Sequence, residues 1–144
     1  MAKKKILGEI NIQQLISTRD FLHEALHEAE SKLEIAGTIQ AFEVCYELAW
    51  KTLQKVLSLK GVDVFSPKEI FRLAAREGLI SNLKGWFDYV KKRNITVHSY
   101  EDEIMKEVYP VLPKFLKDLN LLIKKLCIWV INLSSLLIML GKVD

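Results

Sequence analysis

A seam of apolar residues near the start of the chain constrains the fold more than any other feature. Its members recur at alternating spacings of three and four residues, interrupted only by Arg19: Ile12, Leu15, Arg19, Leu22, Leu26, Ala29 and Leu33. This spacing places them along one side of a long helix. We expect that helix to end at Gly37, with Thr38 capping a second helix from Ile39 to about Leu59.

The second helix is predicted to be apolar over a wide arc. Two neighbouring sides carry its large side chains: Phe42, Cys45, Ala49 and Val56 on one, and Tyr46, Trp50, Leu53 and Leu57 on the other. Glu43, Glu47, Lys51 and Lys55 form a narrow polar stripe, in which Glu47 and Lys51 are a favourable i,i+4 pair. Such an arc indicates either the central helix of a bundle or a helix that also faces a partner subunit.

Local start and stop signals predict two further helices between Ser66 and Arg93. Ser66-Pro67-Lys68-Glu69 is a capping box with proline at the first helical position, and Gly78 ends the short helix that it begins. Ser81 can cap the next helix, which runs into Arg93.

A fifth helix follows, and it completes the expected architecture. Ser99, with Asp102 three residues later, can start this helix, and Pro110 and Pro113 should kink or briefly break it. No segment alternates like a strand between turn signals. We therefore predict an all-α fold, an antiparallel up-and-down helical bundle of four long helices plus a short extra helix.

Composition points to one cytoplasmic domain. The 144 residues can bury a real core, and the net charge of +3 permits contact with RNA or nucleotide phosphates without requiring it. Cys45 and Cys127 lie far apart in apolar surroundings and are expected to be reduced thiols. The Lys3-Lys4-Lys5 run suits a solvated tail, and because no apolar run follows it we expect no secretory signal.

The C-terminal segment differs from the rest, so we divide the chain into a bundle domain, residues 6–125, and an apolar extension, residues 126–144. Leu126 to Leu140 contains no charged residue, but its 15 residues fall short of the roughly 20 needed to span a bilayer. We expect it to be buried in the bundle or in a subunit interface, and we expect no membrane partner.

Two histidines on the first helix could in principle hold a metal. His23 and His27 are i,i+4, a spacing that suits metal ligands. No third ligand is evident, and the neighbours Glu24 and Glu28 indicate a solvated face. We therefore predict neither a metal site nor a cofactor here.

The polar segment between the last two predicted helices is the strongest candidate site. Arg93, Asn94, His98 and Tyr100 place a cation, an amide, an imidazole and a phenol within eight residues. A helix junction can point several such side chains into one cleft. The alternative is a polar loop in which Arg93 and His98 only help to cap helix ends.

Four blocks of the sequence, in this order, resemble the nucleotidyltransferase substrate-binding family, a branch of the HEPN superfamily of helical bundles. The blocks are Phe42 to Leu53, Ser66 to Glu69, Ala75 to Ile80 and Arg93 to Tyr100. The resemblance covers roughly Ile12 to Lys125, and the uncharged tail after Lys125 has no counterpart in it.

The resemblance implies a dimeric bundle whose partner is a separate minimal nucleotidyltransferase. Related members act as toxins of toxin–antitoxin pairs, as metal-independent endoribonucleases whose Arg-x4-6-His motif supplies the site. In members with Arg-x4-His-x-Tyr, the partner silences the nuclease by attaching AMP to the tyrosine. By this resemblance Arg93 and His98 are catalytic and Tyr100 is the modification acceptor. The amide of Asn94 suits substrate binding through the phosphate, and the alternative is that it caps the helix that runs into Arg93.

Elementary chemistry agrees with that assignment. Metal-free RNA cleavage needs a base for the 2′-OH proton and an acid for the leaving 5′-oxygen, and histidine can do either. A guanidinium such as that of Arg93 can stabilise the charge that develops on the phosphorus oxygens. One copy supplies only His98, whereas a two-fold dimer would supply two histidines. A non-catalytic subunit that binds a nucleotide or other substrate for the nucleotidyltransferase stays an alternative, as does a purely structural helical dimer.

Overall fold

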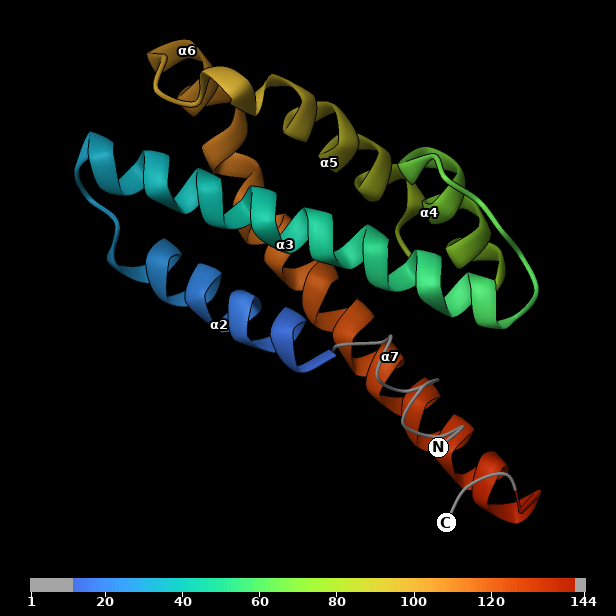
Figure 1. The fold of residues 1–144 in the computed structure, drawn as a ribbon. Helices are drawn as coiled ribbons and strands as arrows, with labels where there is room; N and C mark the ends of the chain where they lie inside the picture. Colours follow the sequence, from blue (N-terminus) through green and yellow to red (C-terminus); the bar gives the residue numbers. More distant parts are fainter. Residues whose placement is uncertain (1–11, 142–144) are drawn as a thin grey trace.

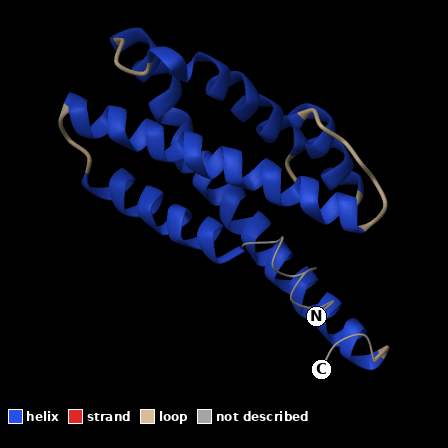
Figure 2. Ribbon diagram, viewed as in Figure 1, coloured by secondary structure: helices blue, strands red, loops and turns tan. Residues whose placement is uncertain are grey.

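The computed structural model describes residues 12–141, and every regular element among them is helical (Figures 1 and 2). The α-helices are α2 (Ile12–Glu28), α3 (Lys32–Leu59), α4 (Pro67–Arg76), α5 (Leu83–Ile95), α6 (Asp102–Val108) and α7 (Leu112–Met139). Two short 3-10 helices, η1 (Thr96–His98) and η2 (Tyr109–Val111), join α5 to α6 and α6 to α7. Helices α2, α3, α5 and α7 run alternately up and down (Figure 1), so the predicted all-α bundle is confirmed. The Lys3-Lys4-Lys5 run lies outside the described residues.

The junction between α2 and α3 lies before Gly37 rather than at it. Ser31, not Thr38, caps α3: its Oγ accepts a hydrogen bond from the Glu34 N–H at 3.1 Å. The Glu34 carboxylate in turn accepts one from the Ser31 N–H at 3.0 Å. The predicted break at Gly37 is therefore wrong, because this capping box satisfies two N–H groups and fixes the helix start upstream. Gly37 continues α3, and the Thr38 hydroxyl donates to the Glu34 carbonyl at 2.8 Å.

Helix α3 is the central helix, as one of the two interpretations of its wide apolar arc predicts. It packs against α2, α4, α5, α6 and α7. Its Phe42 meets Phe115 of α7 edge-on with ring centroids 4.7 Å apart, and Phe115 also meets Tyr89 of α5 at 5.1 Å. Trp86 of α5 stacks on Phe71 of α4 at 4.9 Å and is buried in the core.

The starts of α4 and α5 differ in detail from the predicted caps. Helix α4 begins at Pro67 as expected, but the Ser66 side chain makes no capping hydrogen bond. Asn82, rather than Ser81, caps α5, because its side-chain oxygen accepts from the Gly85 N–H at 3.2 Å. The Asn82 amide also donates to the buried carboxylate of Asp118 on α7 at 2.9 Å, so this residue ties the start of α5 to α7.

The passage from α5 to α7 is broken where the prolines predict. Pro110 lies in η2, and α7 begins two residues later with Pro113 in its first turn. Helix α6, however, starts after Glu101 rather than after Ser99, because η1 occupies the preceding turn. The candidate motif is therefore held on a compact 3-10 turn between two helices.

The C-terminal half of α7 leaves the bundle. The helix continues without a break past Lys125, and its end projects beyond α2 and α3 (Figure 1). Ile131 is 63% exposed and Met139 is 79% exposed. The expectation that this segment is buried within the bundle is therefore wrong for most of its length beyond Leu126, because no other described helix reaches far enough to cover it.

Candidate functional site

Arg93 lies in the last turn of α5 with its guanidinium directed at α3. Its Nη1 is 3.4 Å from a carboxylate oxygen of Glu43, and its Nε is 3.6 Å from one of Glu47. Nη1 also donates a hydrogen bond to Thr96 Oγ at 3.1 Å. The Thr96 hydroxyl, which is buried, donates in turn to the Arg93 carbonyl at 2.8 Å. The first turn after α5 thus holds the arginine that α5 presents.

Burial and the charge of Arg93 have opposite effects on the Glu43 carboxylate of this cluster. Burial raises the pKa of Glu43 above its ordinary value, and the nearby charge of Arg93 offsets only part of that effect. The Arg93 Nε atom is buried and has no hydrogen-bond partner within residues 12–141. A cavity of about 310 Å³ opens beside the cluster, lined by Gln14, Gln40, Glu43, Val44, Glu47, Leu48 and Arg93. The cavity therefore offers a cation, two carboxylates and two amides to a polar ligand.

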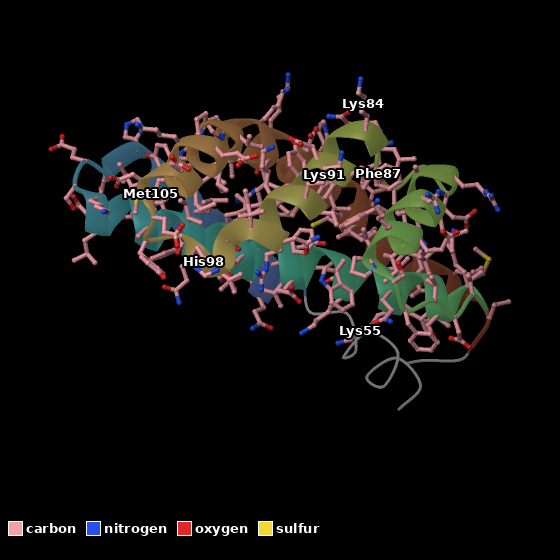
Figure 3. All side chains as sticks on the ribbon, turned by 90° about the horizontal axis from the view of Figure 1, so that it is seen from above. Lys55, Lys84, Phe87, Lys91, His98 and Met105 are labelled. Atoms are coloured by element: carbon pink, nitrogen blue, oxygen red, sulfur yellow. The ribbon has the colours of Figure 1, made fainter. Side chains whose placement is uncertain are left out.

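His98 and Tyr100 form a second group on the surface. His98 ends η1, which packs against α3 (Figure 3), and its side chain is 59% exposed. Its Nδ1 lies 3.4 Å from a carboxylate oxygen of Glu101, so Nε2 is the nitrogen left for proton transfer. The ring of Tyr100 meets that of His98 edge-on at 6.1 Å, and Tyr100 is 63% exposed. Asn94 is exposed on α5.

The structure thus brings the predicted residues to one junction but in two groups. The hydrogen bonds and ion pairs of Arg93 go to α3 and Thr96, whereas His98 contacts Glu101 and Tyr100. In one protomer the guanidinium and the imidazole therefore do not form a single hydrogen-bonded unit.

The acidic partners of Arg93 are not evident from the sequence. Glu43 and Glu47 are one helical turn apart, and their spacing predicts only that they belong to a narrow polar stripe of this helix. The expected pair of Glu47 with Lys51 is present but loose, at 4.0 Å. The available signal was that Glu43 directly follows Phe42 and precedes Cys45 by two residues, both of them core residues, which indicates a carboxylate at the edge of the core.

The remaining candidate residues take no part in this site. His23 and His27 are exposed and stack with ring centroids 6.4 Å apart. Within residues 12–141 no three potential metal ligands lie close enough to form a group. Both cysteines are free thiols, Cys45 buried and Cys127 partly so, and burial raises the pKa of Cys45 to about 11.

Comparison with known proteins shows which family has a similar sequence. Residues 9–127 match the family described as nucleotidyltransferase substrate binding protein like. A Haemophilus influenzae protein named "Probable ribonuclease HepT" is 36% identical over 97 residues, which are 64% of this chain and 66% of that protein, just under two thirds of its length.

Two solved structures share the fold. One is a Haemophilus influenzae protein described as the substrate-binding domain of a nucleotidyltransferase: TM-score 0.73, 29% identity, covering 81% of this chain and 98% of that one. The other, from Thermus thermophilus, has a TM-score of 0.72 at 28% identity and covers 78% of this chain and 98% of its own. The family match spans most of the chain and includes every residue of the candidate site, so this chain belongs to the nucleotidyltransferase substrate-binding protein-like family.

Proposed function

We propose that this chain is the toxin-like subunit of a two-protein nucleotidyltransferase system and that it cleaves RNA without a metal. The observation that carries the proposal is the Arg93-x4-His98-x-Tyr100 junction, with an accessible imidazole and phenol beside a guanidinium that faces a cavity. A relative named as a ribonuclease supports the same activity.

The proposed cleavage uses the substrate's own hydroxyl as the nucleophile. One histidine takes the proton of a ribose 2′-OH, whose oxygen then attacks the adjacent phosphorus. The bond to the 5′-oxygen breaks, and that oxygen receives a proton from an acid, which leaves a 2′,3′-cyclic phosphate and a 5′-hydroxyl. Arg93 would stabilise the charge on the phosphorus oxygens, with Asn94 assisting in phosphate contact.

A homodimer completes this mechanism. A single protomer provides one histidine at the junction, and a two-fold axis would bring a second junction opposite the first. Val97 is 71% exposed and Tyr100 is 63% exposed, so the turn that carries His98 presents apolar surface to solvent in one copy. Exposed apolar side chains around a functional turn support burial against another copy.

Control of the nuclease would come from the partner nucleotidyltransferase. The Tyr100 oxygen would attack the α-phosphorus of ATP, forming a P–O bond as pyrophosphate leaves and the phenol loses its proton. The new phosphate would place negative charge beside the cationic junction, and the nucleoside would occupy the space that an RNA backbone needs. The exposure of Tyr100 supports this role, because an acceptor must reach the active site of another enzyme.

The alternative function is a non-catalytic subunit that binds a nucleotide or substrate for the nucleotidyltransferase. The cavity beside Arg93, lined by two carboxylates and two glutamine amides, favours this alternative, since such groups can bind the polar edge of a base.

The test of the proposed nuclease is RNA cleavage by purified chain in the presence of EDTA, with the ends of the products identified. His98→Ala should reduce the rate by about 100-fold or more with helical content unchanged. Arg93→Lys should also impair cleavage, because an ammonium cannot reproduce the bidentate contact. Cleavage that requires a divalent metal, or that survives both changes, would instead support the binding subunit.

The test of Tyr100 uses Tyr100→Phe, which keeps the ring and removes the nucleophile. We expect this variant to cleave RNA at about the wild-type rate and to resist silencing by the partner enzyme with ATP. Intact mass should rise by AMP units for wild type only. An equal mass increase on the phenylalanine variant would exclude Tyr100 as the acceptor.

A further inference from the structure

One face of α7 is exposed along the whole helix. Residues seven apart stay near the same side of a helix, drifting by only about 20° per repeat. Two such rows are exposed throughout, and we call them the outer face of α7: Lys114, Leu121, Ile128 and Ser135 in one row, and Lys117, Lys124, Ile131 and Ile138 in the other.

The outer face is basic in its first half and apolar in its second. Lys114, Lys117 and Lys124, with the adjacent exposed Lys125, have no ion pair within residues 12–141. The sequence from Leu119 to Val143 contains no acidic residue. Beyond Lys125 the exposed side chains are mainly large and apolar: Ile128, Ile131, Leu136, Ile138, Met139 and Leu140.

A second copy of the helix is a poor occupant for this face. In a parallel pair the lysines of the two rows would face each other and repel. In an antiparallel pair the basic half of one helix would be buried against the apolar half of the other, which leaves buried ammonium groups unpaired.

A lipid bilayer fits both halves. The stretch Asp102–Met139 contains an 18-residue window apolar enough to cross a membrane, yet only 22% of that window is buried, unlike the core helix of a globular protein. The segment free of the bundle, residues 131–140, would be about 15 Å long, shorter than the roughly 30 Å hydrocarbon layer. A helix of this length inserts along the interface, with its lysines at the headgroups and its apolar side chains in the acyl region.

We propose that the outer face of α7 binds a bilayer with anionic headgroups and holds the bundle at the membrane surface. The lysines supply the charge complementarity, because anionic lipids attract basic segments next to an inserted helix. The family match ends at residue 127, so the inserting segment lies beyond it. This membrane contact does not depend on the nuclease activity.

The test is flotation of the full chain with vesicles of phosphatidylcholine alone or with added phosphatidylglycerol. Wild type should float with the anionic vesicles and hardly at all with the neutral ones. Ile131→Glu with Ile138→Glu should abolish flotation, while Leu33→Glu with Phe65→Glu, two similarly exposed apolar positions elsewhere, should leave it unchanged.

Lys124→Gln with Lys125→Gln should weaken binding to the anionic vesicles by about 30-fold, whereas Lys84→Gln with Lys91→Gln should not. Circular dichroism of each variant checks that the bundle is folded.

Four outcomes would overturn the proposal. One is no flotation of wild type with anionic vesicles. Another is equal binding by wild type and the Ile131/Ile138 variant, which would mean that the apolar half does not insert. The third is a fall in molecular mass of the Ile131/Ile138 variant in light scattering without lipid, because the outer face would then be an interface between copies. Loss of RNA binding, but not of flotation, in the Lys124/Lys125 variant would assign the lysines to RNA and also contradict it.

Discussion

The guanidinium of Arg93 lies between two carboxylates of α3, and these would affect the phosphate contact that we propose for it. Glu43 and Glu47 lie 3.4 and 3.6 Å from the guanidinium, so a phosphate must compete with them for the same cation. These distances exceed those of tight charge-assisted hydrogen bonds, so the carboxylates orient the guanidinium without saturating its donors. Nε has no hydrogen-bond partner within residues 12–141, but it is buried, so a phosphate would have to approach the other nitrogens of the guanidinium.

Because the pKa of Glu43 is raised in the folded chain, we expect the stability of the fold to depend on pH through this residue. Because burial favours the protonated carboxyl in the folded chain, the folded state binds this proton more tightly than the unfolded state does. The contribution of Glu43 to stability therefore falls as the pH rises from its ordinary pKa of 4.5 toward neutrality. Glu43→Gln, which mimics the neutral form, should have a melting temperature at pH 7 at least as high as wild type, and the difference should vanish below pH 4.5.

Melting curves from pH 4 to 8, followed by circular dichroism, check this. A variant that is less stable than wild type at pH 7 would show that the charged carboxylate, through Arg93, stabilises the fold more than its burial costs.

At the residue scale the sequence predicted the motif but not its surroundings. Arg93, His98 and Tyr100 were identifiable because they lie within one short segment. Glu43 and Glu47 were not, because their meeting with Arg93 depends on how α5 packs against α3, and sequence spacing within one helix contains no such information.

At the scale of elements, helix ends were harder to predict than helices. The apolar seam continues in sequence from α2 into the first turn of α3, so periodicity alone could not locate the junction. The capping box formed by Ser31 and Glu34 locates it, whereas Gly37, a residue with open space around its Cα, is tolerated inside α3. Side-chain hydrogen bonds at a helix start therefore outweighed the preference of glycine for breaks.

Ser31→Ala tests the energetic weight of that cap. Losing the side-chain acceptor should cost about 1 kcal/mol of unfolding free energy, or roughly 2–4 °C in melting temperature for a domain of this size. Ser66→Ala is the matched control, because Ser66 has the same position before α4 but makes no capping hydrogen bond. Equal losses for the two variants would mean that the Ser31 hydrogen bonds contribute nothing.

At the scale of the whole molecule, the bundle was predictable and its C-terminal end was not. Amphipathic periodicity predicted the core because each helix had one apolar side to bury against α3. From Leu126 onward the helix is apolar on several sides, and periodicity does not indicate which neighbour, if any, covers it. Only the lengths of α2 and α3 in space show that α7 extends past them.

Dimerisation gives the last prediction, because the proposed chemistry needs more than one histidine at each site. Light scattering at micromolar concentration should give twice the mass of one chain. If each site uses His98 from both protomers, a wild-type chain paired with a His98→Ala chain has no complete site. An equal mixture of wild-type and His98→Ala chains, unfolded and refolded together, should then have about one quarter of the activity of an equal total amount of pure wild-type protein. Only pairs of two wild-type chains are active, and they make up one quarter of the dimers. Independent sites would leave about one half. Arg93 is intact in every chain, so the result reports on the histidines alone, and a value of one half, or a monomer in light scattering, would exclude the composite site.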